Sequence, residues 1–428
     1  MNFRWYLFWI RDFLQGGKVH KAYKDIENSY YGRKDNTKQN IQNLLEHAKK
    51  TTEFYSKYNT DSLEQFPVIN KKTIVENYNQ IISTDYKDKK LHKMSTSGST
   101  GTPLTVVQDK RKRSRVIAEV VFFGKMCGYT FGERQMFLRV WVKSVKKSKL
   151  KKILQNMIPE DVSNLDLKKM EEIENILKKD KKLKCILSYA STLNKLSKHL
   201  LEKKYTPKDF SVKSIISGSE LLLEETRENL KELFGCNIVS RYANEENGIL
   251  GQECITDKEI HLNTADYYFE FFKLDEDVPA EEGELSRIVV TDLYNYALPM
   301  IRYDTGDLAI VGKSNCNISA KVIKEIFGRR VDLIYNSKGE ALSPHIITNN
   351  MWGVENIKQF KFTQISKNEY KILLNVTENF QKEKQEKELK EKFGMLLGEG
   401  VIIEIDYTEE IPVLSSGKRK YIENLYRR

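Results

Sequence analysis

Hydrophobic and polar positions follow different patterns in successive parts of the chain. Residues 36–60 place apolar side chains such as Leu44, Leu45 and Ala48 at helical spacing, which predicts an amphipathic helix. From residue 136 onward, short apolar runs typical of strands alternate with helix-like segments, and this alternation indicates an α/β fold. The strands expected in this part cover residues 136–142, 183–187, 212–216 and 236–239.

The pattern changes twice more toward the C-terminus. Extended runs at 267–273, 283–291 and 307–311 follow one another without helices, which predicts an antiparallel or barrel-like section. Beyond them, the expected elements are strands at 358–365, 370–376 and 401–407 and a charge-laced helix at 380–397. This last group predicts a compact α+β unit, and a length of 428 residues also favours two domains.

Composition narrows the class of protein. Apolar residues make up 40% of the chain, which excludes a wholly disordered or collagen-like protein. The five cysteines are scattered and odd in number, so we expect a reducing cytoplasm and no disulfide framework. The net charge of +11 suits anionic partners such as nucleotides, CoA phosphates, nucleic acid or an anionic membrane surface, and it does not choose among them. The densest basic stretch, residues 141–152, matches no nucleic-acid-binding motif, so we expect a solvated face and no nucleic-acid partner.

The N-terminal segment, residues 3–11, is rich in aromatic side chains and is flanked by Arg4 and Arg11. Its apolar run is too short to span a bilayer, and it lacks a signal-peptide cleavage site. We expect it to pack as a terminal helix against the main body. The alternative is an interfacial helix that makes peripheral contact with the inner face of the membrane.

A loop dense in hydroxyls and glycines carries the first chemical signal, at residues 95–104 (S-T-S-G-S-T-G-T-P-L). Its glycines would let backbone N–H groups converge on an anion, and its hydroxyls would donate further hydrogen bonds to phosphate oxygens. It is not a Walker A loop, because no lysine follows a glycine in the required frame. The candidate nucleotide-binding residues here are Thr96, Ser97, Gly98, Ser99, Thr100 and Gly101.

Two further motifs combine turns with charged side chains. In residues 302–307 (R-Y-D-T-G-D), Asp307 could accept hydrogen bonds from both ribose hydroxyls. In residues 327–334 (F-G-R-R-V-D-L-I), the guanidinium of Arg329 could reach ribose or phosphate oxygens. Taken alone, each motif is explained by the ordinary preference of such residues for turns.

Together and in this order, the motifs resemble the adenylate-forming superfamily of acyl-CoA synthetases, adenylation domains and luciferases. Within it, they resemble the phenylacetate-CoA ligase and CapK-like branch, over roughly residues 44–420. The resemblance implies an α/β fold with a large N-terminal AMP-binding domain of mixed sheets and helices, residues 1–331. It also implies a small mobile α+β C-terminal domain, residues 332–428, which carries the catalytic lysine.

The resemblance assigns a role to each motif. Residues 96–103 would hold the ATP phosphates, and Gly218, Ser219 and Glu220 would pack against adenine. Residues 241–246 correspond to the family's Y-G-x-T-E motif, in which Tyr242 would stack on adenine and Glu246 would act in catalysis by holding Mg²⁺.

The remaining roles lie toward the C-terminus. Asp307 would bind ribose, Arg329 would contact ribose or phosphate, and Asp332 would be the hinge between the domains. Residues 415–418 (S-S-G-K) resemble the terminal S-G-K element, which makes Lys418 the mobile lysine that bridges the substrate carboxylate and the α-phosphate.

Three positions depart from the family pattern: Ala243 replaces glycine, Glu245 replaces threonine or serine, and Leu104 stands where many members carry lysine. The first two touch the nucleotide site and leave a non-catalytic nucleotide-binding protein as an alternative.

Some members of the branch carry a structural zinc site. Its counterparts here are Cys254, His261 and Cys316, but Ile318 stands where the fourth ligand would be, so we expect no zinc.

The leading hypothesis is an ATP- and Mg²⁺-dependent ligase that activates a carboxylic acid as an acyl-adenylate, releases pyrophosphate and transfers the acyl group to a thiol, with CoA as the first candidate. A second hypothesis, from the CapK-like resemblance, is transfer to an amine or hydroxyl in capsular or surface polysaccharide synthesis. A third, resembling coenzyme F390 synthetases, is nucleotidyl transfer to a phenolic hydroxyl.

Overall fold

The computed structural model describes residues 2–95, 104–141, 155–314, 316, 321–342, 344–352, 354–412 and 420–426. The chain divides into two compact units. The first comprises Met1–Thr305 and Ala309–Glu325, and the second Gly306–Leu308 and Ile326–Arg428. The expected hinge at residue 332 stays a prediction.

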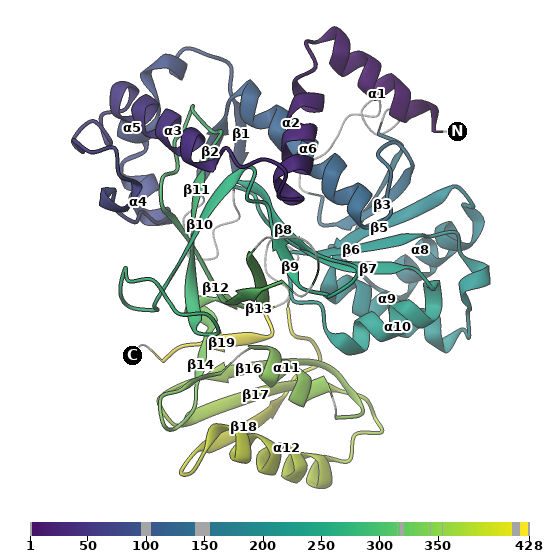
Figure 1. Ribbon diagram of the computed structural model, residues 1–428. Helices are drawn as coiled ribbons and strands as arrows, with labels where there is room; N and C mark the ends of the chain where they lie inside the picture. The colour runs from purple at the N-terminus through teal and green to yellow at the C-terminus, as the bar shows by residue number, and fades with distance from the viewer. Residues whose placement is uncertain are drawn as a thin grey trace. The chain divides into compact units, whose positions relative to one another are not determined.

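Eleven of the described strands form one mixed sheet, most of which belongs to the first unit, in the order β10-β11-β12-β13-β9-β8-β7-β6-β5-β3-β4 (Figure 1). The five strands at one end of this order run parallel to one another. They are β3 (Arg134–Arg139), β4 (Met157–Asp161), β5 (Leu183–Tyr189), β6 (Ser214–Gly218) and β7 (Asn237–Asn244). The α/β pattern predicted from residue 136 onward is therefore confirmed.

Helices α8 (Leu167–Lys179), α9 (Ala190–Glu202) and α10 (Glu224–Phe234) connect the parallel strands and flank them in Figure 1. Each helix buries an apolar stripe against the sheet, as Leu193, Leu196 and Leu200 of α9 show. Their spacing of three and four residues places these leucines on one helix face. This packing fixes the ends of the strands from which the candidate site is built.

The other part of the sheet contains antiparallel pairs, including β7 with β8, β8 with β9, β13 with β9 and β10 with β11. Its strands are β8 (Gly248–Glu253), β9 (Ile260–Leu262), β10 (Tyr267–Phe272), β11 (Leu285–Asp292), β12 (Tyr303–Lys313) and β13 (Lys321–Arg329). The antiparallel section expected after residue 267 is present, whereas β8, β9 and β13 were not predicted.

The N-terminal part of the first unit is mainly helical. Its elements are α1 (Phe3–Leu14), α2 (Lys18–Tyr30), α3 (Thr37–Thr51), η1 (Leu63–Gln65), α4 (Lys71–Glu76), α5 (Tyr78–Ile81), η2 (Thr84–Tyr86), the hairpin of β1 (His92–Ser95) and β2 (Thr105–Gln108), and α6 (Lys110–Met126). A short helix η4 (Pro207–Asp209) precedes β6. None of the described helices has the length and hydropathy that crossing a bilayer requires.

The helix predicted over residues 36–60 ends earlier than expected, at Thr51. Thr52 has extended backbone angles, its hydroxyl donates to the Ala48 carbonyl at 2.8 Å, and the Tyr55 N–H donates to the same hydroxyl at 3.1 Å. Threonine hydroxyls compete in this way for backbone groups, and the competition ends the helix.

The described residues of the second unit form a four-stranded sheet in the order β18-β17-β16-β19, together with the α-helices α11 and α12. Its elements are η5 (Arg330–Asp332), β14 (Ile334–Tyr335), β15 (Ala341–Leu342), α11 (Pro344–Trp352), β16 (Ile357–Gln364), β17 (Glu369–Val376), α12 (Lys382–Leu397), β18 (Ile402–Tyr407) and β19 (Ile422–Asn424). Leu389, Phe393 and Leu397 of α12 join Phe362 and Leu374 of the sheet in one buried core. The predicted α+β unit is confirmed.

Candidate active site

The carboxyl ends of β3, β5, β6 and β7 meet at one edge of the parallel sheet (Figure 1). Ligands of open α/β sheets bind outside this edge. Arg139 ends β3, Tyr189 ends β5, Gly218 ends β6, and Tyr242 lies near the end of β7. The fold therefore brings two sequence-predicted residues, Gly218 and Tyr242, to the same edge.

The segment that follows β6 is held in an uncommon backbone conformation. Ser219 has a φ of 69°, in the left-handed region that non-glycine residues rarely adopt. Such strain persists where the surrounding structure imposes it, and it concentrates at functional sites. The Glu220 carboxylate accepts a hydrogen bond of 2.8 Å from the Ser191 N–H in the first turn of α9. This bond anchors the segment to a helix N-terminus, where a negative charge is favourable.

Two aromatic residues border this edge of the sheet. Tyr189 is 8% exposed, and burial raises the pKa of its hydroxyl although the nearby Arg139 opposes the change. Trp141 is equally buried, and its indole N–H donates to the Glu160 carbonyl at 3.1 Å. By analogy with the family that the chain resembles, we expect the acyl pocket near residues 141–189 and around 217–248, and both aromatic residues lie in the first of these ranges.

Glu246 lies in the turn between β7 and β8. The turn is closed by a hydrogen bond of 2.8 Å from the Asn247 N–H to the Asn244 side-chain oxygen. One Glu246 carboxylate oxygen accepts from the Tyr303 hydroxyl at 3.3 Å, and its carbonyl accepts from the Gln108 amide at 3.2 Å. A half-buried carboxylate held in this way is a suitable ligand for Mg²⁺.

Glu245, the additional carboxylate in this turn, faces a different partner. Its carboxylate lies 4.0 Å from the Arg139 guanidinium, and its side chain is 47% exposed. The negative charge of Glu245 is therefore partly offset by an arginine from the end of β3.

A fully buried ionic cluster supports the start of β8, directly after this turn. Lys112 of α6 lies 2.8 Å from the Asp292 carboxylate, 2.8 Å from the Tyr267 hydroxyl and 3.9 Å from Glu119. The second Glu119 carboxylate oxygen accepts from the Ile249 N–H at 2.9 Å. Burial raises the pKa of Glu119 well above its ordinary value, although Lys112 opposes the shift. Sequence reasoning missed this cluster.

Gly248 is required where the turn meets the cluster. Its φ is 135°, and a Cβ at this position would lie 2.5 Å from the Glu119 carboxylate. Only glycine adopts this backbone angle without strain and leaves the space that the carboxylate occupies. The path of the backbone after Glu246 is thus fixed by one glycine and one buried acid.

The second unit carries three more of the predicted residues. Asp307 is half-buried on β12, Arg329 is exposed at the end of β13, and Asp332 closes η5. The Lys420 ammonium lies 3.0 Å from the Asp332 carboxylate and 3.2 Å from that of Glu423. Burial opposes the charged form of Lys420, but these two carboxylates raise its pKa above the ordinary value.

Several predicted residues lie outside the described part of the chain. They are Thr96, Ser97, Gly98, Ser99, Thr100 and Gly101 of the phosphate loop, and Lys418. Their assigned roles stay predictions.

The structure brings Cys254, His261 and Cys316 together, with their ligand atoms within 4.8 Å of one another. The Asp257 carboxylate lies 3.1 Å from His261 Nε2, but it does not belong to the group of three whose ligand atoms lie this close together. Two thiolates and an imidazole are ligand types that Zn²⁺ binds, but a structural zinc site is typically closed by four protein ligands. The expectation that no zinc binds here stays a prediction.

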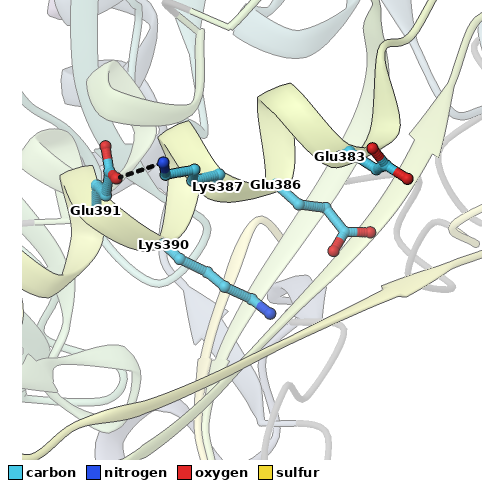
Figure 2. A pocket seen from close by; sticks show the side chains of 5 residues that line it. All are labelled: Glu383, Glu386, Lys387, Lys390 and Glu391. Atoms are coloured by element: carbon cyan, nitrogen blue, oxygen red, sulfur yellow. Dashed lines mark ion pairs between the residues drawn. The ribbon is translucent and has the colours of Figure 1, made fainter.

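The pocket drawn in Figure 2 belongs to the second unit. Five charged residues of one helix, α12, line it: Glu383, Glu386, Lys387, Lys390 and Glu391. Lys387 and Glu391 form an ion pair of 3.9 Å along the helix, and Glu386 accepts a hydrogen bond from the Tyr407 hydroxyl. The lining contains none of the motif residues, so we assign no ligand to it.

Comparisons with known proteins confirm the resemblance to the adenylate-forming superfamily and to its phenylacetate-CoA ligase and CapK-like branch. Residues 334–425 match the CapK C-terminal domain family. Protein CapK from Staphylococcus aureus is 23% identical over 416 residues, which cover 90% of this chain and 88% of the relative. Phenylacetate-coenzyme A ligase from Thermus thermophilus is 26% identical over 159 residues, which cover 36% of this chain and 35% of that enzyme.

Solved structures confirm the fold. A crystal structure of 2-hydroxyisobutyryl-CoA ligase in the postadenylation state, in complex with R3-HIB-AMP, matches with a TM-score of 0.74 at 14% identity. The match covers 93% of this chain and 90% of that structure. An open conformation of the same ligase with 2-HIB-AMP and CoA matches with a TM-score of 0.62 at 15% identity, covering 91% of each chain.

Proposed function

We propose that this protein is an AMP-forming ligase that activates a carboxylic acid with ATP and then transfers the acyl group to an acceptor. The proposal rests chiefly on the Tyr242–Glu246 segment at the carboxyl edge of the parallel sheet, in a fold that matches an acyl-adenylate-binding ligase over 93% of this chain. Glu246, fixed by Tyr303 and Gln108, supplies a carboxylate where the resemblance places the metal ligand.

In the first step, an oxygen of the acid forms a bond to the α-phosphorus of ATP. The bond from this phosphorus to the bridging oxygen breaks, and pyrophosphate leaves with the electron pair. Glu246 would hold Mg²⁺, which neutralises phosphate charge when bound. Lys418 would bridge the carboxylate and the α-phosphate and stabilise the negative charge of the transition state. No covalent bond to the protein is needed.

In the second step, the acceptor forms a bond to the acyl carbon, AMP leaves with the electron pair of the broken C–O bond, and the acceptor loses a proton. CoA is the first candidate acceptor, because the phenylacetate ligase and the 2-hydroxyisobutyryl ligase are both CoA ligases by name. A hinge at Asp332 would let the small domain supply Lys418 for the first step and then open the acceptor channel.

The family resemblance leaves a second acceptor class open, and the match to CapK over 90% of the chain supports the CapK-like branch from which that class was inferred. Transfer to an amine or hydroxyl, as in the decoration of a surface polysaccharide, uses the same acyl-adenylate. The acceptor does not alter the first step, so the two proposals are tested separately.

Acid-dependent exchange of labelled pyrophosphate into ATP tests the first step, against a panel of aryl, short-chain, amino and sugar acids. We expect exchange with one class of acid, and none in Lys418→Ala. ATP binding without exchange for any acid would contradict acyl activation and favour nucleotidyl transfer or a non-catalytic protein. Mass spectrometry of products formed with CoA, and then with amino sugars, identifies the acceptor.

A further inference from the structure

Helix α1 presents two opposite apolar faces, and the protein covers one of them. Trp5, Phe8 and Trp9 form the inner face and join the core that α2 and α6 build. The rings of Phe8 and Phe131 lie 4.6 Å apart, and the Asn2 side chain donates to the Phe131 carbonyl at 2.9 Å. The expected packing of this segment as a terminal helix is therefore present.

The only acidic side chain of α1 also holds the helix in place. Asp12 is buried, and its carboxylate accepts hydrogen bonds from the Val19 and His20 N–H groups at 3.0 and 2.9 Å. These groups lie at the start of α2, where N–H groups lack helical partners. Because Asp12 is used in this way, no acid of α1 faces solvent.

The outer face of α1 is a continuous apolar stripe. Its six large side chains recur at intervals of three and four residues, which places them on one side of the helix. Their exposed fractions are 70% for Phe3, 49% for Tyr6, 47% for Leu7, 55% for Ile10, 79% for Phe13 and 78% for Leu14. A cluster of this kind on one helix marks an interaction surface.

Positive charge borders the stripe. Arg4 and Arg11 are exposed, and their separation of seven residues places them on the same side of α1, next to Leu7 and Leu14. Exposed apolar side chains flanked by arginines, without an exposed acid in the helix, complement a surface that combines acyl chains with anionic headgroups. A neutral apolar partner would not require the arginines.

We propose that α1 is an interfacial membrane helix that attaches this protein reversibly to anionic lipid bilayers. The helix lies in the plane of the surface, with its outer face among the headgroups and the first acyl carbons. The inner face stays packed on the protein, so α1 binds as a preformed element and not by folding on contact. This attachment is independent of the proposed ligase activity.

Vesicle co-sedimentation of the full chain tests the proposal, with phosphatidylcholine vesicles and with vesicles that also contain phosphatidylglycerol. We expect the full chain to bind the anionic vesicles. The variant Phe3→Ser/Ile10→Ser/Phe13→Ser should lose at least tenfold in affinity. The variant Arg4→Gln/Arg11→Gln should lose about fivefold for each arginine on anionic vesicles, and its binding should depend less on salt.

The matched control, Ile255→Ser/Met395→Ser/Ile402→Ser, removes apolar side chains that are 55%, 82% and 56% exposed elsewhere on the chain. It should bind vesicles like the unaltered protein. An equal loss in this control, or equal binding to neutral and anionic vesicles, would overturn the proposal. A third outcome would also overturn it: the full chain binds no vesicles and forms a dimer in sedimentation velocity, and the α1 triple variant dissociates this dimer. The partner of the outer face would then be a second copy of this chain.

Discussion

Replacement of Lys112 by methionine tests the buried ionic cluster that supports the turn after Glu246. The Lys112 ammonium is fully buried, within 2.8 Å of Asp292 and 3.9 Å of Glu119. Methionine has a similar volume, so the substitution removes the charge with little change in packing. It leaves two carboxylates without their buried cation, and such a loss costs about 3–5 kcal/mol. We expect the free energy of unfolding of the first unit to fall by this amount.

Urea unfolding followed by tryptophan fluorescence measures the change. Three of the four tryptophans, Trp5, Trp9 and Trp141, lie in the first unit. Every protein in the comparison also carries Trp352→Phe, so that the fluorescence reports on the first unit alone. For an m-value of about 3 kcal/mol/M, the expected midpoint shift is about 1–1.7 M. Lys110→Met is the control, because this residue of α6 is exposed and its replacement should change stability by less than about 0.5 kcal/mol.

The loss should also depend on pH. Burial raises the pKa of Asp292, and Lys112 opposes this shift, so its removal raises the pKa further. A carboxyl with a raised folded-state pKa takes up a proton more readily when folded, which favours folding as pH falls. The deficit of Lys112→Met should therefore be largest near neutral pH and smaller at about pH 5. A deficit below about 1 kcal/mol, or one unchanged by pH, would refute this description of the cluster.

Three further tests concern the site. Purified protein should contain less than one zinc per chain by mass spectrometry of metals, because Cys254, His261 and Cys316 supply only three ligands, whereas one zinc per chain that Cys316→Ser removes would contradict this expectation. Lys420→Met removes the ion pair with Asp332, the proposed hinge residue. It should lower the adenylation rate severalfold with little change in thermal stability. An unchanged rate would show that this ion pair has no part in the hinge motion. Gly248→Ala should cost about 2 kcal/mol or more because a Cβ would meet Glu119, while Gly283→Ala, which has a positive φ and open space, should cost less.

Local patterns predicted much of the fold. Apolar runs located the parallel strands, since such strands are covered on both faces and read as continuous apolar segments. The strand predicted at 183–187 is β5 (Leu183–Tyr189), and the helix predicted at 380–397 is α12 (Lys382–Leu397). Strand β9 was missed because it has three residues and is defined by its partners, not by a pattern of its own.

The candidate site was less predictable where it depends on contacts between distant residues. Asp257 lies outside the motif that suggested zinc, and only the fold shows it beside His261. Lys112 and Asp292 are 180 positions apart, and nothing local predicts that they pair. The many basic residues of α6 were a usable signal, because a helix that packs in the core would bury some of them. A buried lysine requires a carboxylate partner, so the signal would have prompted a search for one. The roles assigned to the motif residues themselves stay predictions.

The transfer of oxygen from the acid to AMP tests acyl-adenylate formation most directly. The acid identified by pyrophosphate exchange is prepared with ¹⁸O in both carboxyl oxygens and incubated with ATP, the protein and an acceptor. If the carboxylate attacks the α-phosphorus, AMP gains one ¹⁸O per turnover, pyrophosphate gains none, and Lys418→Ala forms no labelled AMP. Product formation with unlabelled AMP would contradict the proposed mechanism.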